Sequence, residues 1–306
     1  MSAQHPILSR LETGRPLLAS ADAEASLRAA GASLQWPAAL GRFIREHPAL
    51  VAEHYHQEVA AGVDVLCALT ADTLPRVLAQ IGMPFRAAAL TGCAVDLALD
   101  AAEAAPRPVI VAGILGSASI APTAPERMAE ELAIHATRLA AAGCELLIAR
   151  GFAGSPAREK LAKAARRAAI ISASATQIPT WAVLEVDEAG LSTEREPVEN
   201  VAFAAVEAGA ELLLFEVPSA ESGVALLERV RAVVPETPLG FVAAALPRGA
   251  SGAGESPDAW AASAKRLLDA GARVLGGGVG TTYQHLAALT NLVRGSERQS
   301  RWPRTG

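Results

Sequence analysis

The stretch EAGAELLLFEV, residues 207–217, carries the pattern that decides the fold. A helical segment ends at Ala-Gly, and a short apolar run follows it. The same pattern occurs as AAGVDVLCALT (60–70), AAGCELLIARG (141–151) and DAGARVLGGGV (269–279). Glycine just past a helix end allows the left-handed cap, and a nearly uniform apolar run is typical of a strand buried on both faces. This weak internal repeat therefore predicts helices that alternate with buried parallel strands.

The segments between the repeats complete a regular series of strands and helices. The predicted strands are Pro16–Ser20, Val63–Leu69, Pro108–Leu115, Glu145–Arg150, Thr180–Val186, Glu211–Val217, Pro238–Ala244 and Arg273–Gly277. The predicted helices are Ala21–Ala30, Pro48–Ala61, Asp72–Ile81, Ala87–Ala104, Pro125–Ala142, Pro156–Ala169, Pro197–Ala208, Ala220–Val233, Pro257–Ala270 and Thr282–Val293. Eight strands alternating with helices favour the α/β class and a single (β/α)8 TIM barrel. An open doubly wound sheet is the alternative.

The chain shows no internal linker. We expect one domain over residues 1–294, followed by a loose polar tail, GSERQSRWPRTG, over 295–306. The N-terminus has no apolar core of signal-peptide length, and the long uncharged stretch 108–125 is interrupted by proline and glycine, so we expect no membrane span.

The amino-acid composition argues against some classes of binding partner. The formal charge is -5, and 51% of the residues are hydrophobic against 19% charged. A weakly acidic chain is a poor match for nucleic acid or an anionic membrane, which leaves a small-molecule ligand. The three cysteines, Cys67, Cys93 and Cys144, are odd in number and widely spaced. They predict no disulfide framework and favour a cytoplasmic location. The oligomeric state is left open.

In a barrel of this kind the active site lies at the carboxyl ends of the strands. Arg150 and Glu216 each place a charge at the end of an otherwise apolar strand, where a charge has to be paired or functional. We take these two as candidate catalytic residues; a structural ion pair at the rim is the alternative. The same rule gives five candidate substrate-binding residues: Asp22, Thr70, Ser117, Gly278 and Thr281.

The histidines indicate less about the site than the charged residues at the strand ends do. His54 and His56 lie two residues apart on a predicted helix and so do not share a face; we expect surface or helix-end positions for them. His285 lies in the first turns of the last helix and is close enough to the strand ends to face the mouth of the barrel. The glycine run LGGGVGTT (275–282) either exposes backbone N–H groups to a phosphate or allows a tight strand-to-helix turn.

Several segments of the sequence resemble the homocysteine S-methyltransferase family, zinc-dependent barrels that methylate homocysteine. The resemblance covers about Leu17 to Val293. Its carriers are HPALVAEHYHQEVAAGVDVL (47–66), VIVAGILGS (109–117), AAGCELLIA (141–149) and, most specifically, WAASAKRLLDAGARVLGGGVGTTYQHLAAL (260–289).

The resemblance implies a barrel whose zinc ion is held by three cysteines, and those cysteines are missing here. The family's Gly-Gly-Cys-Cys-Gly-Thr has Gly278-Val279 in place of Cys-Cys, and Glu216 stands where the family's third zinc cysteine lies. The opening Asp-Gly motif falls near Ser20-Ala21, and the family's acidic residue after strand four falls on Arg150. We therefore expect no metal and no other cofactor, because glycine and valine cannot ligate zinc.

Four functions remain open. The first is a divergent methyltransferase that acts on a small polar substrate without thiolate-bound zinc, and the second is a non-catalytic barrel for binding or assembly. The third is a conventional thiol methyltransferase whose zinc ligands lie elsewhere in the sequence. The fourth is a barrel that binds a phosphate-bearing ligand. Whether it is an enzyme is not decided by the sequence.

Overall fold

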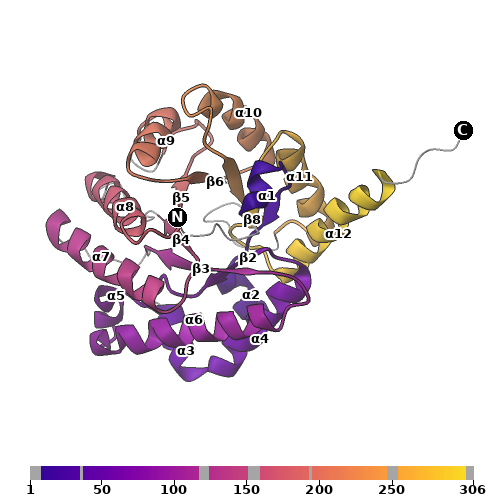
Figure 1. Ribbon diagram of the computed structural model, residues 1–306. Helices are drawn as coiled ribbons and strands as arrows, with labels where there is room; N and C mark the ends of the chain where they lie inside the picture. The colour runs from indigo at the N-terminus through magenta and orange to yellow at the C-terminus, as the bar shows by residue number, and fades with distance from the viewer. Residues whose placement is uncertain are drawn as a thin grey trace, which may run out of the picture.

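The computed structural model describes residues 8–34, 37–116, 124–150, 159–192, 195–246 and 254–300, and the structural statements below concern these residues. Eight parallel strands form a nearly closed barrel surrounded by helices (Figure 1). The strands are β1 (Leu17–Leu18), β2 (Val65–Ala68), β3 (Ile110–Leu115), β4 (Leu146–Arg150), β5 (Thr180–Glu185), β6 (Leu212–Val217), β7 (Leu239–Ala243) and β8 (Val274–Gly277). The predicted TIM barrel is confirmed, and the open doubly wound sheet is excluded.

The sheet order is β1-β8-β7-β6-β5-β4-β3-β2, so β1 and β2 meet where the barrel closes. An isolated parallel bridge joins Ala19 to Val65. On either side of it, Ser20 N–H donates to the Val65 carbonyl at 3.1 Å, and Asp64 N–H donates to the Leu18 carbonyl at 2.7 Å. The barrel is therefore closed by a few bonds around the short strand β1.

Helices cover the outside of the barrel (Figure 1). They are α1 (Ser9–Glu12), α2 (Ala23–Ala29), α3 (Ala39–Glu46), α4 (Pro48–Ala61), α5 (Pro75–Ala79), the 3₁₀ turn η1 (Pro84–Arg86), α6 (Ala87–Glu103), α7 (Pro125–Ala141), α8 (Glu159–Ser174), α9 (Val198–Glu207), α10 (Ala220–Arg231), α11 (Pro257–Asp269) and α12 (Tyr283–Ser300). Gly62, Gly143, Gly209 and Gly271, the glycines of the repeated Ala-Gly pattern, all have φ near +100°. They end their helices in the left-handed conformation, as the sequence predicts.

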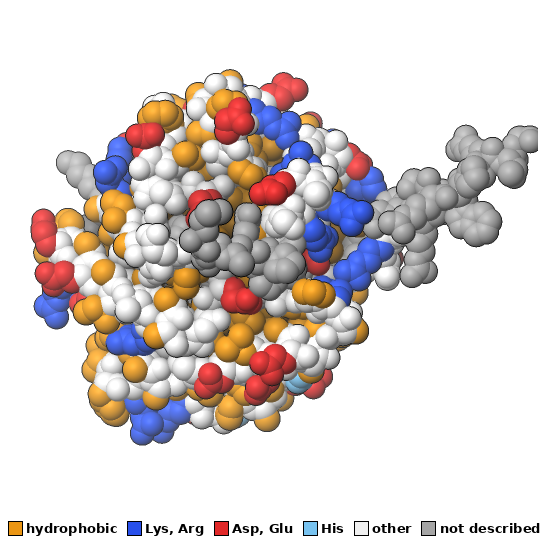
Figure 2. All heavy atoms as spheres, viewed as in Figure 1, with side chains coloured by type: hydrophobic (Ala, Val, Ile, Leu, Met, Phe, Trp, Pro, Cys, Tyr) orange, Lys and Arg blue, Asp and Glu red, His pale blue; other side chains and the backbone are white. Residues whose placement is uncertain are grey.

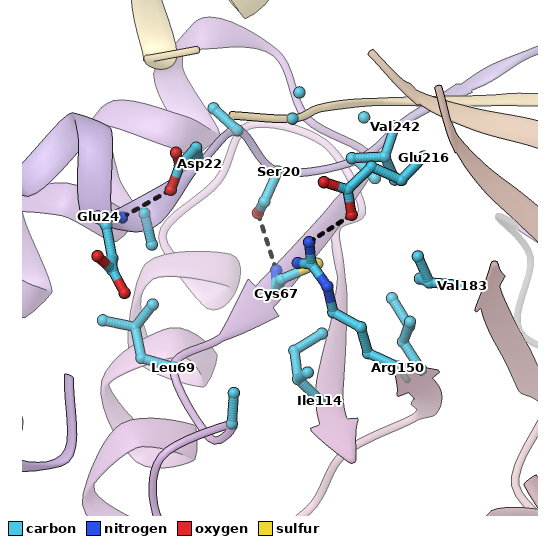
Figure 3. A pocket seen from close by; sticks show the side chains of 18 of the residues that line it. Ser20, Asp22, Glu24, Cys67, Leu69, Ile114, Arg150, Val183, Glu216 and Val242 are labelled. Atoms are coloured by element: carbon cyan, nitrogen blue, oxygen red, sulfur yellow. Dashed lines mark hydrogen bonds and ion pairs between the residues drawn. The ribbon is translucent and has the colours of Figure 1, made fainter. Parts of the chain in front are cut away.

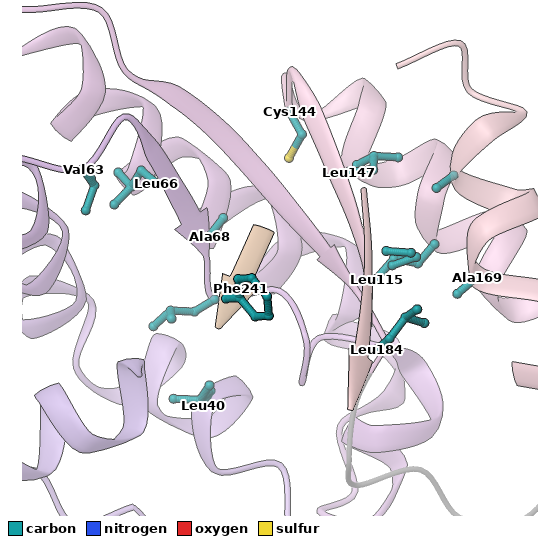
Figure 4. Close-up of a cluster of buried hydrophobic side chains, with 14 of the residues drawn as sticks. Leu40, Val63, Leu66, Ala68, Leu115, Cys144, Leu147, Ala169, Leu184 and Phe241 are labelled. Carbon is teal, nitrogen blue, oxygen red and sulfur yellow. The ribbon is translucent and has the colours of Figure 1, made fainter. Parts of the chain in front are cut away.

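Two hydrophobic cores follow from the alternation of side chains along each strand. One set fills the barrel interior and includes Leu146, Ile148, Leu212 and Leu214. The other lies between the strands and the helices, where Leu66, Leu147 and Phe241 pack (Figure 4). Because alternate residues face inward, Arg150 follows Leu146 and Ile148 into the interior, and Glu216 follows Leu212 and Leu214. Strand periodicity thus places both charges at the mouth.

Several elements differ from the sequence prediction. Helix α3 was not predicted. Helix α5 begins at Pro75 and not at the predicted Asp72. The Asp72 side chain instead accepts the N–H of Leu40 in the first turn of α3, at 3.1 Å. Helix α12 continues to Ser300, beyond its predicted end at Val293, and projects away from the barrel at the right of Figure 1. The predicted helix start at Pro156 lies outside the described residues.

Charges of both signs are intermixed over the face seen in Figure 2, and its described part shows no broad basic patch. Within the described ranges, no helix combines the length and the apolar character needed to cross a membrane.

Candidate functional site

A cavity of about 420 Å³ opens at the carboxyl ends of the strands. This is the end where TIM barrels carry their active sites, and the volume suits a small molecule. Arg150, Glu216, Asp22 and Gly278, four of the predicted site residues, all line it. Figure 3 shows Asp22 and Glu24 on one side of the cavity and Arg150 with Glu216 on the other, with Ser20 and Cys67 between.

Arg150 and Glu216, the two candidate catalytic residues, form an ion pair. Arg150 Nη2 donates to Glu216 Oε2 at 2.6 Å. The Glu216 side chain is only 6% exposed, whereas that of Arg150 is 41% exposed. A buried carboxylate therefore holds the guanidinium in place, while the Arg150 side chain as a whole stays partly exposed at the cavity. A guanidinium in this position can bind a carboxylate or phosphate group of a ligand.

Asp22 connects the end of β1 to the loop after β8. Its Oδ1 accepts the N–H groups of Glu24 and Ala25 and so caps helix α2. Its Oδ2 accepts the N–H of Gly280 at 3.1 Å, and its own N–H donates to Thr281 Oγ1 at 3.1 Å. Asp22 is thus a structural clamp as well as part of the cavity wall.

Two of the predicted substrate-binding residues do not reach the cavity. Thr281 is fully buried, and its hydroxyl donates to the Gly278 carbonyl at 2.7 Å. Thr70 is also fully buried; its hydroxyl donates to the Ile114 carbonyl and accepts the Ile114 N–H. Both hydroxyls position backbone instead of lining the cavity. The predicted residue Ser117 lies outside the described residues.

The phosphate alternative for the glycine run is not supported by the loop geometry. The N–H groups of Gly278, Gly280 and Thr281 already donate to Ala243 O, Asp22 Oδ2 and Gly278 O. The Thr282 N–H donates to His285 Nδ1. An anion would find these four donors occupied and the Asp22 carboxylate beside it. The run instead makes the tight strand-to-helix turn.

His54 was expected at the surface or at a helix end, and the structure corrects this. It is 4% exposed and lines the cavity, whereas His56 is exposed, so the two do not share a face. One turn further along α4, Glu58 is fully buried and accepts the Ala21 N–H at 3.0 Å. Glu58 was not among the predicted site residues. His285 packs edge-on against Trp260 and bonds to the Glu255 carbonyl, outside the cavity wall.

The residues at the strand ends do not fit a thiolate zinc site. Gly277, Gly278 and Val279 offer no side-chain ligand. Cys67 lines the cavity, and burial, reinforced by the nearby Glu58 charge, raises the pKa of its thiol to about 11. Cys144 is buried at the start of β4, away from the mouth, and Cys93 lies on α6. In the part of the chain that is described, no group of three His, Cys, Asp or Glu side chains could hold a metal ion.

Comparison with known proteins agrees with this architecture. Residues 18–293 match the family model described as homocysteine S-methyltransferase. The solved structure of the homocysteine methyltransferase MmuM from Escherichia coli, metallated form, is 20% identical with a TM-score of 0.77, covering 94% of this chain and 100% of that one. Its oxidized form gives 21% identity and a TM-score of 0.76 over 94% and 99%.

A more distant match is the carboxyl transferase domain of Rhizobium etli pyruvate carboxylase. It is 16% identical with a TM-score of 0.53, over 93% of this chain and 45% of that one. At these identities the structural likenesses establish the barrel alone. No curated protein sequence matches the chain significantly.

Proposed function

This chain belongs to the homocysteine S-methyltransferase family, and from that premise we propose that it transfers a methyl group to or from a small polar molecule without a thiolate-bound zinc ion. Arg150 binds an anionic group of that molecule, and Glu216 holds Arg150 in position. The cavity at the barrel mouth is the reaction site. The composition and the free cysteines further support a cytoplasmic location.

The Arg150–Glu216 ion pair carries this proposal. An ion pair that is exposed to solvent contributes little to stability, and the Arg150 side chain is 41% exposed at the opening of a cavity of about 420 Å³. The guanidinium presents donors in a fork that matches a carboxylate. Removing Arg150 should therefore remove the anion-binding group of the site.

The chemistry of the remaining side chains supports a zinc-free reaction. In a zinc-dependent reaction of this kind the metal lowers the pKa of the substrate thiol, and the substrate thiolate is the nucleophile. The described mouth offers one thiol of its own, Cys67, whose pKa of about 11 keeps it protonated near neutral pH and makes it a poor zinc ligand. The bound molecule must then carry a group that is nucleophilic without a metal.

The experiment combines metal analysis with a search for turnover. Purified protein is incubated with a panel of thiols, amino acids, and sulfonium or betaine methyl donors, and methylated products are identified by mass spectrometry. We expect substoichiometric zinc, product formation that survives a chelator, and loss of product in Arg150→Met. Product formation that requires zinc and stops on mutation of Cys67 would instead identify a conventional thiol methyltransferase.

A second candidate is a binding barrel without catalysis. It is favoured by the Asp22–Gly280 bond, which fixes the loop after β8 with no need of a metal. In that case ligands from the panel raise the melting temperature of the wild type but not of Arg150→Met, and no methylated product forms.

A further inference from the structure

Helix α4 brings two buried polar residues to the cavity: His54 lines it, and Glu58 lies behind Ala21 in its wall. Its buried positions are Val51, His54, Tyr55, Glu58 and Val59, together with Ala61 at its end. Spacings of three and four place these residues on one helix face. His54 and Glu58 therefore lie one turn apart on a stripe that is otherwise apolar or aromatic, facing the end of β1.

Each of these two side chains has a buried polar atom without a partner. Within the described chain, neither His54 Nδ1 nor Glu58 Oε2 has a hydrogen-bond partner. A buried polar atom left unpaired costs about 1–3 kcal/mol, and such groups are rare in folded proteins. Two of them, one turn apart and beside a cavity, indicate that a further donor belongs here.

The charges around this pair favour a cationic donor. The pKa of Glu24 is raised, first by burial and then by the neighbouring Asp22 and Asp72 carboxylates. Three carboxyl side chains, those of Asp22, Glu24 and Asp72, thus line the cavity together. Burial lowers the pKa of His54 despite the opposing charges of Glu58 and Asp22. Its imidazole is therefore neutral near pH 7 and can accept a hydrogen bond.

The cavity is consequently bipolar. Asp22 lies on one side of the cavity and Arg150 on the other (Figure 3). His54 also lines the cavity, within range of the charges of Asp22 and Glu58, and Glu58 lies directly behind Ala21. We propose that Asp22, His54 and Glu58 form an ammonium-binding subsite, so that the ligand is a small molecule with a protonated amine at one end and a carboxylate at the other. The ammonium donates to His54 and Asp22, and Glu58 supplies charge behind them. The carboxylate arm rests on the role proposed for Arg150.

Matched pairs of small molecules test this subsite. The probes are β-alanine, γ-aminobutyrate and δ-aminovalerate, each compared by calorimetry with the carboxylate of the same chain length, propanoate, butyrate or valerate. One charge-assisted hydrogen bond corresponds to roughly tenfold or more in affinity. We expect the amino carboxylate of the best-fitting length to bind at least about tenfold tighter than its partner. Equal affinities within every pair would overturn the proposal.

Variants separate the two ends of the ligand. Glu58→Gln keeps the acceptor for Ala21 N–H but removes the charge, and it should cancel the preference for the amine while leaving butyrate binding unchanged. Glu53→Gln, on the exposed side of the same helix, is the matched control and should change neither. If Glu58→Gln does not fold, His54→Gln with His56→Gln as its control gives the same comparison.

Two further outcomes distinguish this inference from the proposed function. If Arg150→Met leaves every affinity unchanged while the amine preference persists, the ammonium subsite stands and the role proposed for Arg150 fails. If ammonium chloride alone abolishes the preference by occupying the site as tightly as the amino carboxylates do, the site holds an inorganic cation and the proposed ligand class is wrong.

Discussion

The carboxylate of Asp22 accepts a hydrogen bond from the backbone N–H of Gly280, across 3.1 Å and 258 positions of sequence. This bond joins the first strand-to-helix turn of the barrel to the last. Asp22 also caps helix α2 through two further N–H groups. The place where the barrel closes thus depends on one side chain.

We expect Asp22→Ala to destabilise the protein by roughly 2 kcal/mol, because it removes a helix cap and leaves the Gly280 N–H unpaired. Asp22→Asn, which keeps one acceptor oxygen, should cost less. Urea denaturation measures both. The control is Asp258→Asn, in the first turn of α11, where Ser256 provides the cap. If Asp22→Ala proves no less stable than this control, Asp22 is not a clamp.

A double-mutant cycle should give the Arg150–Glu216 pair a small coupling energy. Because the Arg150 side chain is 41% exposed, solvent screens the pair, and we expect about 1 kcal/mol from Arg150→Met, Glu216→Gln and the double variant. Ligand affinity should fall by a much larger factor in Arg150→Met. A coupling of several kcal/mol without effect on ligand binding would mark the pair as structural.

His135 should make the protein sensitive to acid. It is fully buried on α7, and burial, with a contribution from Arg138, lowers its pKa from 6.5 to about 4. The unfolded chain takes up this proton at a higher pH than the folded chain does. The contribution of neutral His135 to the free energy of unfolding is therefore complete above pH 6.5 and is lost as the pH falls towards 4.

This shift in the pKa of His135 corresponds to a loss of about 3 kcal/mol in the free energy of unfolding at most. Melting temperatures recorded between pH 7 and 4 should fall less steeply in His135→Leu than in the wild type, whereas His56→Gln, at an exposed position, should follow the wild type. Parallel profiles for all three proteins would contradict the assignment.

Cys67 should be a slow thiol whose reactivity reports the charge of Glu58. With a pKa of about 11, its alkylation by iodoacetamide at pH 8 should be roughly 100-fold slower than that of a free cysteine. Glu58→Gln removes a negative charge that raises this pKa, so alkylation should become several-fold faster. Peptide mass spectrometry follows Cys67 and, as an internal control on α6, Cys93. No change at Cys67 would mean that Glu58 does not control the reactivity of this thiol.

The barrel could be predicted from sequence because its signals are local. The Ala-Gly ends and the apolar runs each report on neighbouring residues, and strand alternation then carries Arg150 and Glu216 to the mouth. Helix α3 was missed because its first turn is completed from far away: Asp72 accepts the Leu40 N–H. Ala38, at the N-cap position, makes no side-chain cap bond and has φ of 55°, so no local signal marks the start.

The α4 side of the site was missed for a different reason. The spacing of His54 and His56 shows only that these two side chains do not share a helix face. The spacing of His54 from Val51, Tyr55 and Val59 shows which face His54 lies on. The periodicity of these buried residues places His54 on the core face together with Glu58. The sequence does contain this signal, since it shows polar residues at the buried positions of a helix. It does not show that His54 Nδ1 and Glu58 Oε2 lack hydrogen-bond partners, because that depends on how α4 packs against the end of β1.

Restoring the missing thiolates should restore a metal site. The variant Glu216→Cys/Gly278→Cys/Val279→Cys places three thiols at the ends of β6 and β8, which is sufficient for zinc. Gly278 does not have a positive φ, and a Cβ there meets Ala244 N at 3.0 Å, so the neighbouring backbone has to yield by only a few tenths of an ångström. We expect stoichiometric zinc in this variant and none in the wild type, measured by plasma mass spectrometry after dialysis.

The matched control replaces the same three residues by serine, which adds similar bulk without thiolates. If the cysteine variant folds but takes up no zinc, these positions do not correspond to the family's ligand positions, and the argument for a lost site fails with them. If the wild type itself retains stoichiometric zinc, the ligands lie elsewhere, and the proposal of a zinc-free reaction fails.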